Sequence, residues 1–149
     1  MEIDFGQLER EFLIDLGLSF LCGLIIGVER ELHKKPAGIS TQTLVIAAAM
    51  LFAFISRITP GDPTRIAAQI VSGIGFLGAG LIIKSESKEQ VSNVTTAASI
   101  WYAAAIGMAL GFNYHFIAVT GALFVTFIAW FPRVQQFQKF FARPFKKKR

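Results

Sequence analysis

The sequence predicts an all-α fold, a polytopic membrane helix bundle with five transmembrane helices. Of its 149 residues, 53% are hydrophobic, and the mean hydropathy is +0.52. Charged residues fall in short clusters between long apolar runs, a pattern typical of integral membrane proteins. A helix needs about 17–25 residues to cross a bilayer. The apolar runs cover about 12–28, 43–58, 66–83, 94–111 and 116–131, so we expect a single membrane domain over residues 1–149.

The first two runs are bounded by helix-breaking and turn residues. The N-terminus is acidic and lacks the basic region of a secretory signal, so we expect the first run to be retained as a helix. The charged segment 29–38 contains Pro36 and Gly38 and predicts a loop. The segment 59–63 predicts a turn, in which Asp62 caps the next helix and Pro63 occupies its first position.

The third run is rich in glycine. In water each interior glycine would cost a helix about 1 kcal/mol, but in lipid glycines allow a second helix to approach closely. We therefore expect 66–83 to be the central packing helix of the bundle. Its glycines are Gly73, Gly75, Gly78 and Gly80. Three of them fit the G-x-G-x-x-G dinucleotide pattern, but no acidic residue follows in 93–99 and apolar residues continue on both sides, so helix packing is the better interpretation.

The charge distribution predicts an orientation with the N-terminus outside and the C-terminus inside. Five crossings place twelve Lys and Arg residues in the first and third loops and in the basic tail 132–149, against three on the other side. This agrees with the excess of positive charge on the cytoplasmic side. A basic tail next to an apolar segment is expected to meet anionic lipid headgroups of the bilayer, and we expect no nucleic-acid partner.

Polar residues at membrane depth are the first candidates for function, because burying them is costly. Asp15 heads a ridge of residues four apart in the first run, and Arg65 and Gln69 begin a similar ridge in the third. We expect an Asp15–Arg65 pair, either as a static ion pair or as an ion or proton site around Asp15. Gln69 is expected to make an interhelical hydrogen bond. The small residues of these ridges and of a third in 99–111 include Gly23, Gly27 and Gly107.

The sequence shows a second polar group at the cytoplasmic end of the first run. Glu29, Arg30 and Glu31 are adjacent and point in different directions around a helix. They predict either headgroup-level solvation with pairing to nearby lysines, or a gate or partner site. His33 and His115 are expected on opposite sides, each solvated. With one cysteine, Cys22, and no nucleophile paired with a base, we expect no disulfide, metal, cofactor or enzyme activity.

Three sequence blocks resemble the MgtC/SapB family of bacterial membrane proteins. They are Gly27-Val-Glu-Arg-Glu31 with Lys35-Pro36-Ala-Gly38, the block from Asp62 to Gly80, and Thr95-Thr-Ala-Ala-Ser-Ile-Trp101 with Ala104-Ala-Ile-Gly107. The resemblance covers roughly 13–126. It implies a multi-pass protein of the bacterial cell inner membrane, linked to growth at low magnesium and in some members to virulence. It also implies functional roles for Asp15, for the Glu29–Glu31 cluster and for the Asp62–Arg65 segment.

Two departures from the family pattern are visible. Gly38-Ile-Ser-Thr-Gln42 stands where the family often has Gly-Leu-Arg-Thr-His. Virulence-type members carry a soluble C-terminal domain, whereas this chain ends 18 residues after Phe131, so we expect that domain's input to be absent.

Two functions remain open from the sequence. One is a regulator of another membrane complex, with F-type ATP synthase as the partner that the resemblance implies. The other is a small ion or proton transporter that uses Asp15 and Gln69. A homodimer is expected to be compatible with either.

Overall fold

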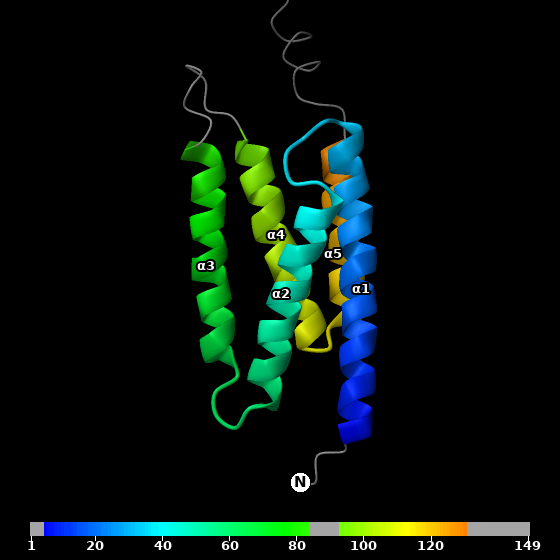
Figure 1. Ribbon diagram of the computed structural model, residues 1–149, viewed down its shortest axis with the longest axis vertical. Helices are drawn as coiled ribbons and strands as arrows, with labels where there is room; N and C mark the ends of the chain where they lie inside the picture. Colours follow the sequence, from blue (N-terminus) through cyan, green and yellow to red (C-terminus); the bar gives the residue numbers. More distant parts are fainter. Residues whose placement is uncertain (1–4, 84–92, 131–149) are drawn as a thin grey trace, which may run out of the picture.

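The computed structural model describes residues 5–83 and 93–130, which form five α-helices. They are α1 (Phe5–Leu32), α2 (Ile39–Ile58), α3 (Thr64–Ile83), α4 (Val94–Gly111) and α5 (His115–Trp130). The helices lie side by side and alternate in direction (Figure 1). The all-α prediction is therefore confirmed, while the predicted loop 84–92 and basic tail 132–149 lie outside the described residues.

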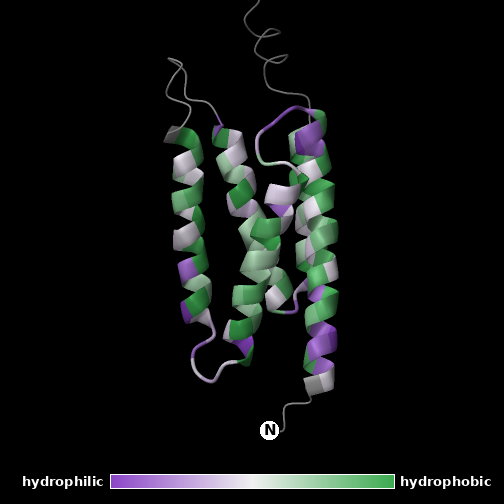
Figure 2. Ribbon diagram, viewed as in Figure 1, coloured by the Kyte–Doolittle hydropathy of each residue, from purple (hydrophilic) through white to green (hydrophobic). Residues whose placement is uncertain are grey.

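The helices have the length and apolar character of membrane spans. Four of them, α1 to α4, are long and apolar enough to cross a bilayer, and α5 is apolar but has only 16 residues. Hydrophilic residues gather toward the two ends of the bundle, and the middle is apolar (Figure 2). The chain is thus a multi-pass membrane protein, whereas the N-outside orientation stays a prediction.

Two helices extend furthest beyond the predicted apolar runs. α1 has 28 residues, about 42 Å at 1.5 Å per residue, which exceeds a hydrocarbon core of about 30 Å. α2 begins at Ile39, four residues before the predicted start, with Gly38 as its N-cap. Glycine has no side chain to cap a helix, and the Glu31 carboxylate of α1 accepts the Ile39 N–H instead, at 3.0 Å. A distant side chain therefore does the capping, which local sequence patterns cannot reveal.

α2 and α4 form the centre of the bundle, with α1 packed on α2 and α5 packed on both α1 and α4. Gly107 of α4 lies against the backbone of α2, where a Cβ would overlap the Ile46 carbonyl oxygen. Gly27 and Gly23 of α1 lie in the same way against Ile39 and Thr43, in the first two turns of α2. These contacts are the close approaches that small residues permit between helices.

α3 lies at the edge of the bundle, so the prediction that it is the central packing helix is wrong. It packs only on α4 and α2 and does not contact α1 (Figure 1). A Cβ built on Gly73, Gly75 or Gly80 would meet nothing within 4 Å, and one on Gly78 would meet only Ala97, at 3.7 Å. These glycines are two or three positions apart, so they fan around the helix and cannot all face one neighbour.

Candidate functional site

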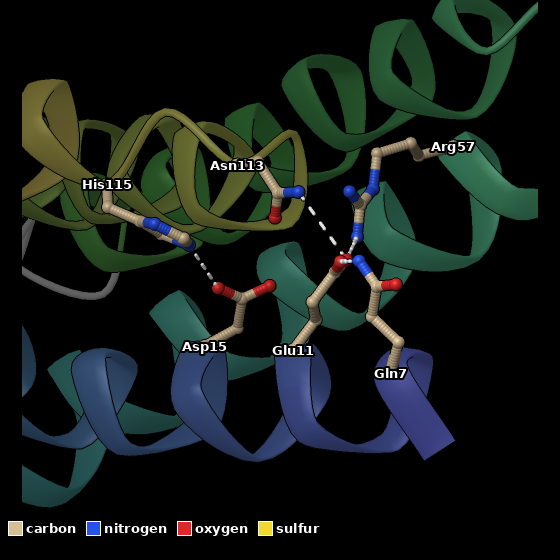
Figure 3. Close-up of polar contacts among 6 residues, drawn as sticks. All are labelled: Gln7, Glu11, Asp15, Arg57, Asn113 and His115. Carbon is tan, nitrogen blue, oxygen red and sulfur yellow. Dashed lines mark hydrogen bonds and ion pairs between the residues drawn. The ribbon is translucent and has the colours of Figure 1, made fainter. Parts of the chain in front are cut away.

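The first candidate site is a group of polar side chains at the end of the bundle where α1 begins. It joins α1, α2 and the turn between α4 and α5 (Figure 3). Its members, which we call the Asp15 cluster, are Gln7, Glu11, Asp15, Arg57, Asn113 and His115.

Asp15 is the most deeply buried member of the Asp15 cluster. Its side chain is 0% exposed, and its Oδ1 lies 2.7 Å from Nε2 of His115, the first residue of α5. The other carboxylate oxygen, Oδ2, is buried and has no hydrogen-bond partner within residues 5–83 and 93–130. Ser19 donates its hydroxyl to the Asp15 backbone carbonyl at 2.8 Å. The site therefore holds a buried carboxylate that is bound on one side only.

Glu11, one turn before Asp15, is the second carboxylate of the cluster. Its Oε2 lies 3.0 Å from an Arg57 guanidinium nitrogen of α2 and accepts the Asn113 amide at 3.5 Å. Asn113 has a φ of +63°, a left-handed conformation that asparagine tolerates better than most residues. This conformation turns the chain sharply between α4 and α5 and brings His115 back to α1. The turn therefore positions both Asn113 and His115.

The predicted Asp15–Arg65 pair is not formed. Arg65 is exposed at the start of α3, and α3 does not touch α1. The two residues do lie at the same end of the bundle, but helix neighbours, which sequence spacing does not give, place Arg57 and His115 beside α1 instead. His115 is 41% exposed, but it is also bound to Asp15, a partner that was not predicted.

Gln69 also lies away from α1. It is exposed on α3 and lines an apolar cavity of about 540 Å³ between α2 and α3. It is the only polar side chain among the residues lining this cavity, which does not reach Asp15. The expected grouping of Asp15, Arg65 and Gln69 around one site is therefore not found.

The second candidate site lies at the opposite end of the bundle and is centred on Arg30, which is 5% exposed. One guanidinium nitrogen of Arg30 donates to the hydroxyl of Thr96 in α4 and to the carbonyl of Pro36, the latter at 3.3 Å. Ser99 donates to the Thr96 carbonyl at 2.8 Å, and the Gln42 amide donates to the Ser99 hydroxyl at 3.1 Å. These contacts link α1, α2 and α4 through buried polar groups.

The acidic neighbours of Arg30 have partners other than the expected lysines. Glu29 is 6% exposed, and its Oε1 lies 3.1 Å from His33. Glu31 caps α2, as described above, and its side chain occupies the space that a Cβ on Gly38 would need. Within the loop, the Lys35 backbone N–H donates to the Arg30 carbonyl at 2.9 Å. The predicted loop signature thus folds the chain tightly around the end of α1.

Asp62 holds the turn that leads into α3. Its Oδ1 accepts the Thr64 hydroxyl at 2.7 Å and the Thr64 N–H at 2.9 Å. These two hydrogen bonds, the hydroxyl one first, hold the pKa of the exposed Asp62 carboxyl below its usual value. The helix begins at Thr64, so Pro63 precedes it rather than occupying its first position.

The described residues contain no group of three or more His, Cys, Asp or Glu side chains placed to hold a metal ion. The expected absence of a metal or cofactor and of enzyme activity stays a prediction.

Comparisons with known proteins agree on one family. The MgtC family model matches residues 16–137. Protein SapB of Bacillus subtilis is 36% identical over 141 residues, which cover 85% of this chain and 60% of the relative. Protein MgtC of Salmonella typhimurium is 44% identical over 101 residues, covering 67% of this chain and 43% of the relative. Protein MgtC of Brucella abortus is 48% identical over 95 residues, covering 62% and 39%.

This chain thus spans from about two fifths to three fifths of the length of these curated relatives. No solved structure gives a significant match. The match to the family model covers most of the chain and includes all three blocks that carried the resemblance. The chain belongs to the MgtC family.

Proposed function

We propose that the protein regulates another membrane protein complex of the bacterial inner membrane, as part of adaptation to low magnesium, and that it binds this complex through the outer face of α3. Family membership supports the physiological setting. The exposure of α3 is the observation that supports the binding surface.

The outer face of α3 has the residues that membrane helices use to associate. Small residues recur at spacings of four, three and four along its exposed side, so they form one stripe. This stripe, which we call the small face, consists of Ala68, Ser72, Gly75 and Ala79. Within the bundle, Gly107 already lets α4 pack against the α2 backbone. A partner helix could approach the small face equally closely, and close packing is what drives helix association in lipid.

Arg65 favours a partner that is not a second copy of the chain. It is exposed three residues before Ala68, at one end of the small face. A twofold axis along the membrane normal would bring two Arg65 side chains together at the same depth. Like charges repel, so a helix with a carboxylate near that membrane boundary fits better. F-type ATP synthase, the partner implied by the family resemblance, is the first complex to test.

The experiment compares two glycines that both face open space. A Cβ on Gly75 of α3 or on Gly17 of α1 meets nothing within 4 Å. Gly75→Leu should therefore leave the fold intact but block a helix on the small face, while Gly17→Leu is the matched control. Tagged variants are extracted from bacterial membranes in mild detergent, and recovery of ATP synthase subunits is measured. We expect at least a tenfold loss for Gly75→Leu only; equal recovery from both variants would reject the small face as the binding surface.

A second candidate function is transport of an ion or proton, and the buried Asp15 carboxylate supports it. Carboxylates at membrane depth often mark ion pathways. Purified protein in liposomes would be assayed for Mg²⁺, K⁺ and proton flux, comparing the wild type with Asp15→Asn. A flux that the variant loses would favour transport over regulation, and no flux from correctly folded protein would remove this candidate.

A further inference from the structure

We propose that Asp15 and His115 together form a proton-binding site, and that the bound proton keeps α5 attached to α1. The ligand of this site is a single exchangeable proton. The proposal concerns α1 and α5, neither of which contacts α3, so it stands independently of partner binding.

In the Asp15–His115 pair the carboxylate is buried, whereas the imidazole is partly exposed. Asp15 is 0% exposed and His115 is 41% exposed, with 2.7 Å between Oδ1 and Nε2. Protons from solvent can therefore reach the imidazole but not the carboxylate directly. Asp15 Oδ2, which has no hydrogen-bond partner within the described residues, points away from His115, toward the side where Glu11 and Asn113 lie (Figure 3). One oxygen of a buried carboxylate is thus left without a donor.

The surrounding charges explain why the site should hold a proton. The groups that face it are Glu11 on α1, Arg57 on α2 and Asn113 in the α4–α5 turn (Figure 3). Glu11 and Arg57 bind each other at 3.0 Å, so their charges offset one another. When His115 is neutral, with its proton on Nε2, Asp15 carries one uncompensated negative charge in a buried position. Such a charge is strongly disfavoured in a low-dielectric setting.

Binding one more proton removes that charge. The proton enters at the exposed imidazole and is shared by the pair, either as an imidazolium–carboxylate ion pair or as a neutral acid beside a neutral imidazole. Both forms have no net charge. Loss of the proton leaves the buried carboxylate uncompensated, which favours separation of His115 and Asp15 so that water can reach the oxygen. Because His115 is the first residue of α5, separation begins to release α5 from α1.

The test measures thermal stability of the full chain in nanodiscs from about pH 5 to about pH 9. A free carboxyl titrates near pH ~3.9 and a free imidazole near pH ~6.5. Between these values both the folded and the unfolded chain hold one proton at this pair, so its contribution should be flat. The proposal requires the folded site to keep its proton above about pH 6.5, where the free imidazole of the unfolded chain loses its own. Stability must then fall as pH rises, because the folded state binds more protons.

Asp15→Asn should abolish this alkaline fall, because an amide carries no charge at any pH. The matched control is His33→Gln, which removes the other histidine–carboxylate pair, Glu29–His33, at the opposite end of the bundle. This variant should still show an alkaline fall, because it leaves the Asp15–His115 pair intact. A wild-type profile that stays flat above pH 6.5, or an alkaline fall that persists undiminished in Asp15→Asn, would overturn the proposal.

If Asp15→Asn does not fold, hydrogen exchange of the wild-type protein tests the proposal instead. Amide exchange of α5, corrected for the intrinsic effect of pH, is compared with that of α3. The proposal expects α5 to open at least tenfold more often at pH 9 than at pH 6, with no comparable change in α3. Equal responses in the two helices would overturn it. Whether Gly75→Leu loses or keeps partner binding bears only on the proposed function.

Discussion

Substitution of Gly107 tests how tightly the two central helices are packed. A Cβ at this position would overlap the Ile46 carbonyl oxygen of α2 and would lie only 2.8 Å from the Ala49 Cβ and 2.9 Å from the Met50 backbone nitrogen. Two of these three atoms belong to backbone, so a change of side-chain rotamer cannot relieve the contact. The helices must move apart, and overpacking of this kind costs about 1–3 kcal/mol.

Gly107→Ala should therefore lower the free energy of unfolding by about that amount, measured by SDS titration in mixed micelles with tryptophan fluorescence. Gly75→Ala is the matched control, because a Cβ there meets nothing within 4 Å. It should be neutral, or stabilising by up to about 1 kcal/mol through helix propensity. If the two variants were equally stable, the close approach of α2 and α4 would be refuted as a source of stability.

Three further substitutions have defined outcomes. Ala37 has a φ of +61°, a conformation that costs a non-glycine residue about 1–2 kcal/mol, so Ala37→Gly should raise the free energy of unfolding, and a decrease would contradict the loop geometry. Arg57→Gln breaks a partly exposed ion pair with Glu11, so unfolding measurements should show a loss below about 1 kcal/mol. The pKa of the Asp62 carboxyl is lower in the folded chain than its unfolded value of about 3.9. This difference stabilises the fold at pH values above about 3.9, and the stabilisation is lost as pH falls through the folded pKa. The stability difference between wild type and Asp62→Asn should therefore shrink on acidification in a pH series, and a difference that grows would contradict this sign.

The sequence was sufficient to find the helices because their signal is local. Apolar runs bounded by charges, Pro36 and Asp62 located five helices, with α4 at the predicted bounds. The ends of α1 and α2 were less accurate. The start of α2 depends on Glu31, a side chain from another helix, and such a contact leaves no trace in the local pattern.

Helix neighbours could not be predicted in the same way. The sequence positions of Asp15 and Arg65 indicate how deep each residue lies in the membrane and on which face of its own helix. They do not indicate which helices are in contact. At this end of the bundle α1 lies beside α2 and α5, so the polar partners of Glu11 and Asp15 are Arg57 and His115. A useful signal was available in Arg57, which lies in the last turn of the helix that must run antiparallel to α1.

The glycines of the third run show a related limit. Glycine in a membrane helix indicates that something can approach closely, but it does not say whether the approaching helix belongs to the same molecule. Gly107 faces α2 of its own chain, whereas Gly75 faces open space. In α4, glycine therefore allows close packing within the bundle. In α3, according to the proposed function, it allows a helix of another protein to bind.

Site-specific photocrosslinking can capture a partner helix while it lies on the small face of α3. A photoreactive residue is placed at Ser72 on the small face of α3, and a control probe is placed at Gly17 on α1, both in living bacteria. We expect the Ser72 probe to form an adduct with a subunit of another membrane complex, identified by mass spectrometry. Adding Gly75→Leu should abolish this adduct, and the Gly17 probe should not form it. Adducts only with lipid or with a second copy of the chain, or the same adduct from both probes, would contradict the account.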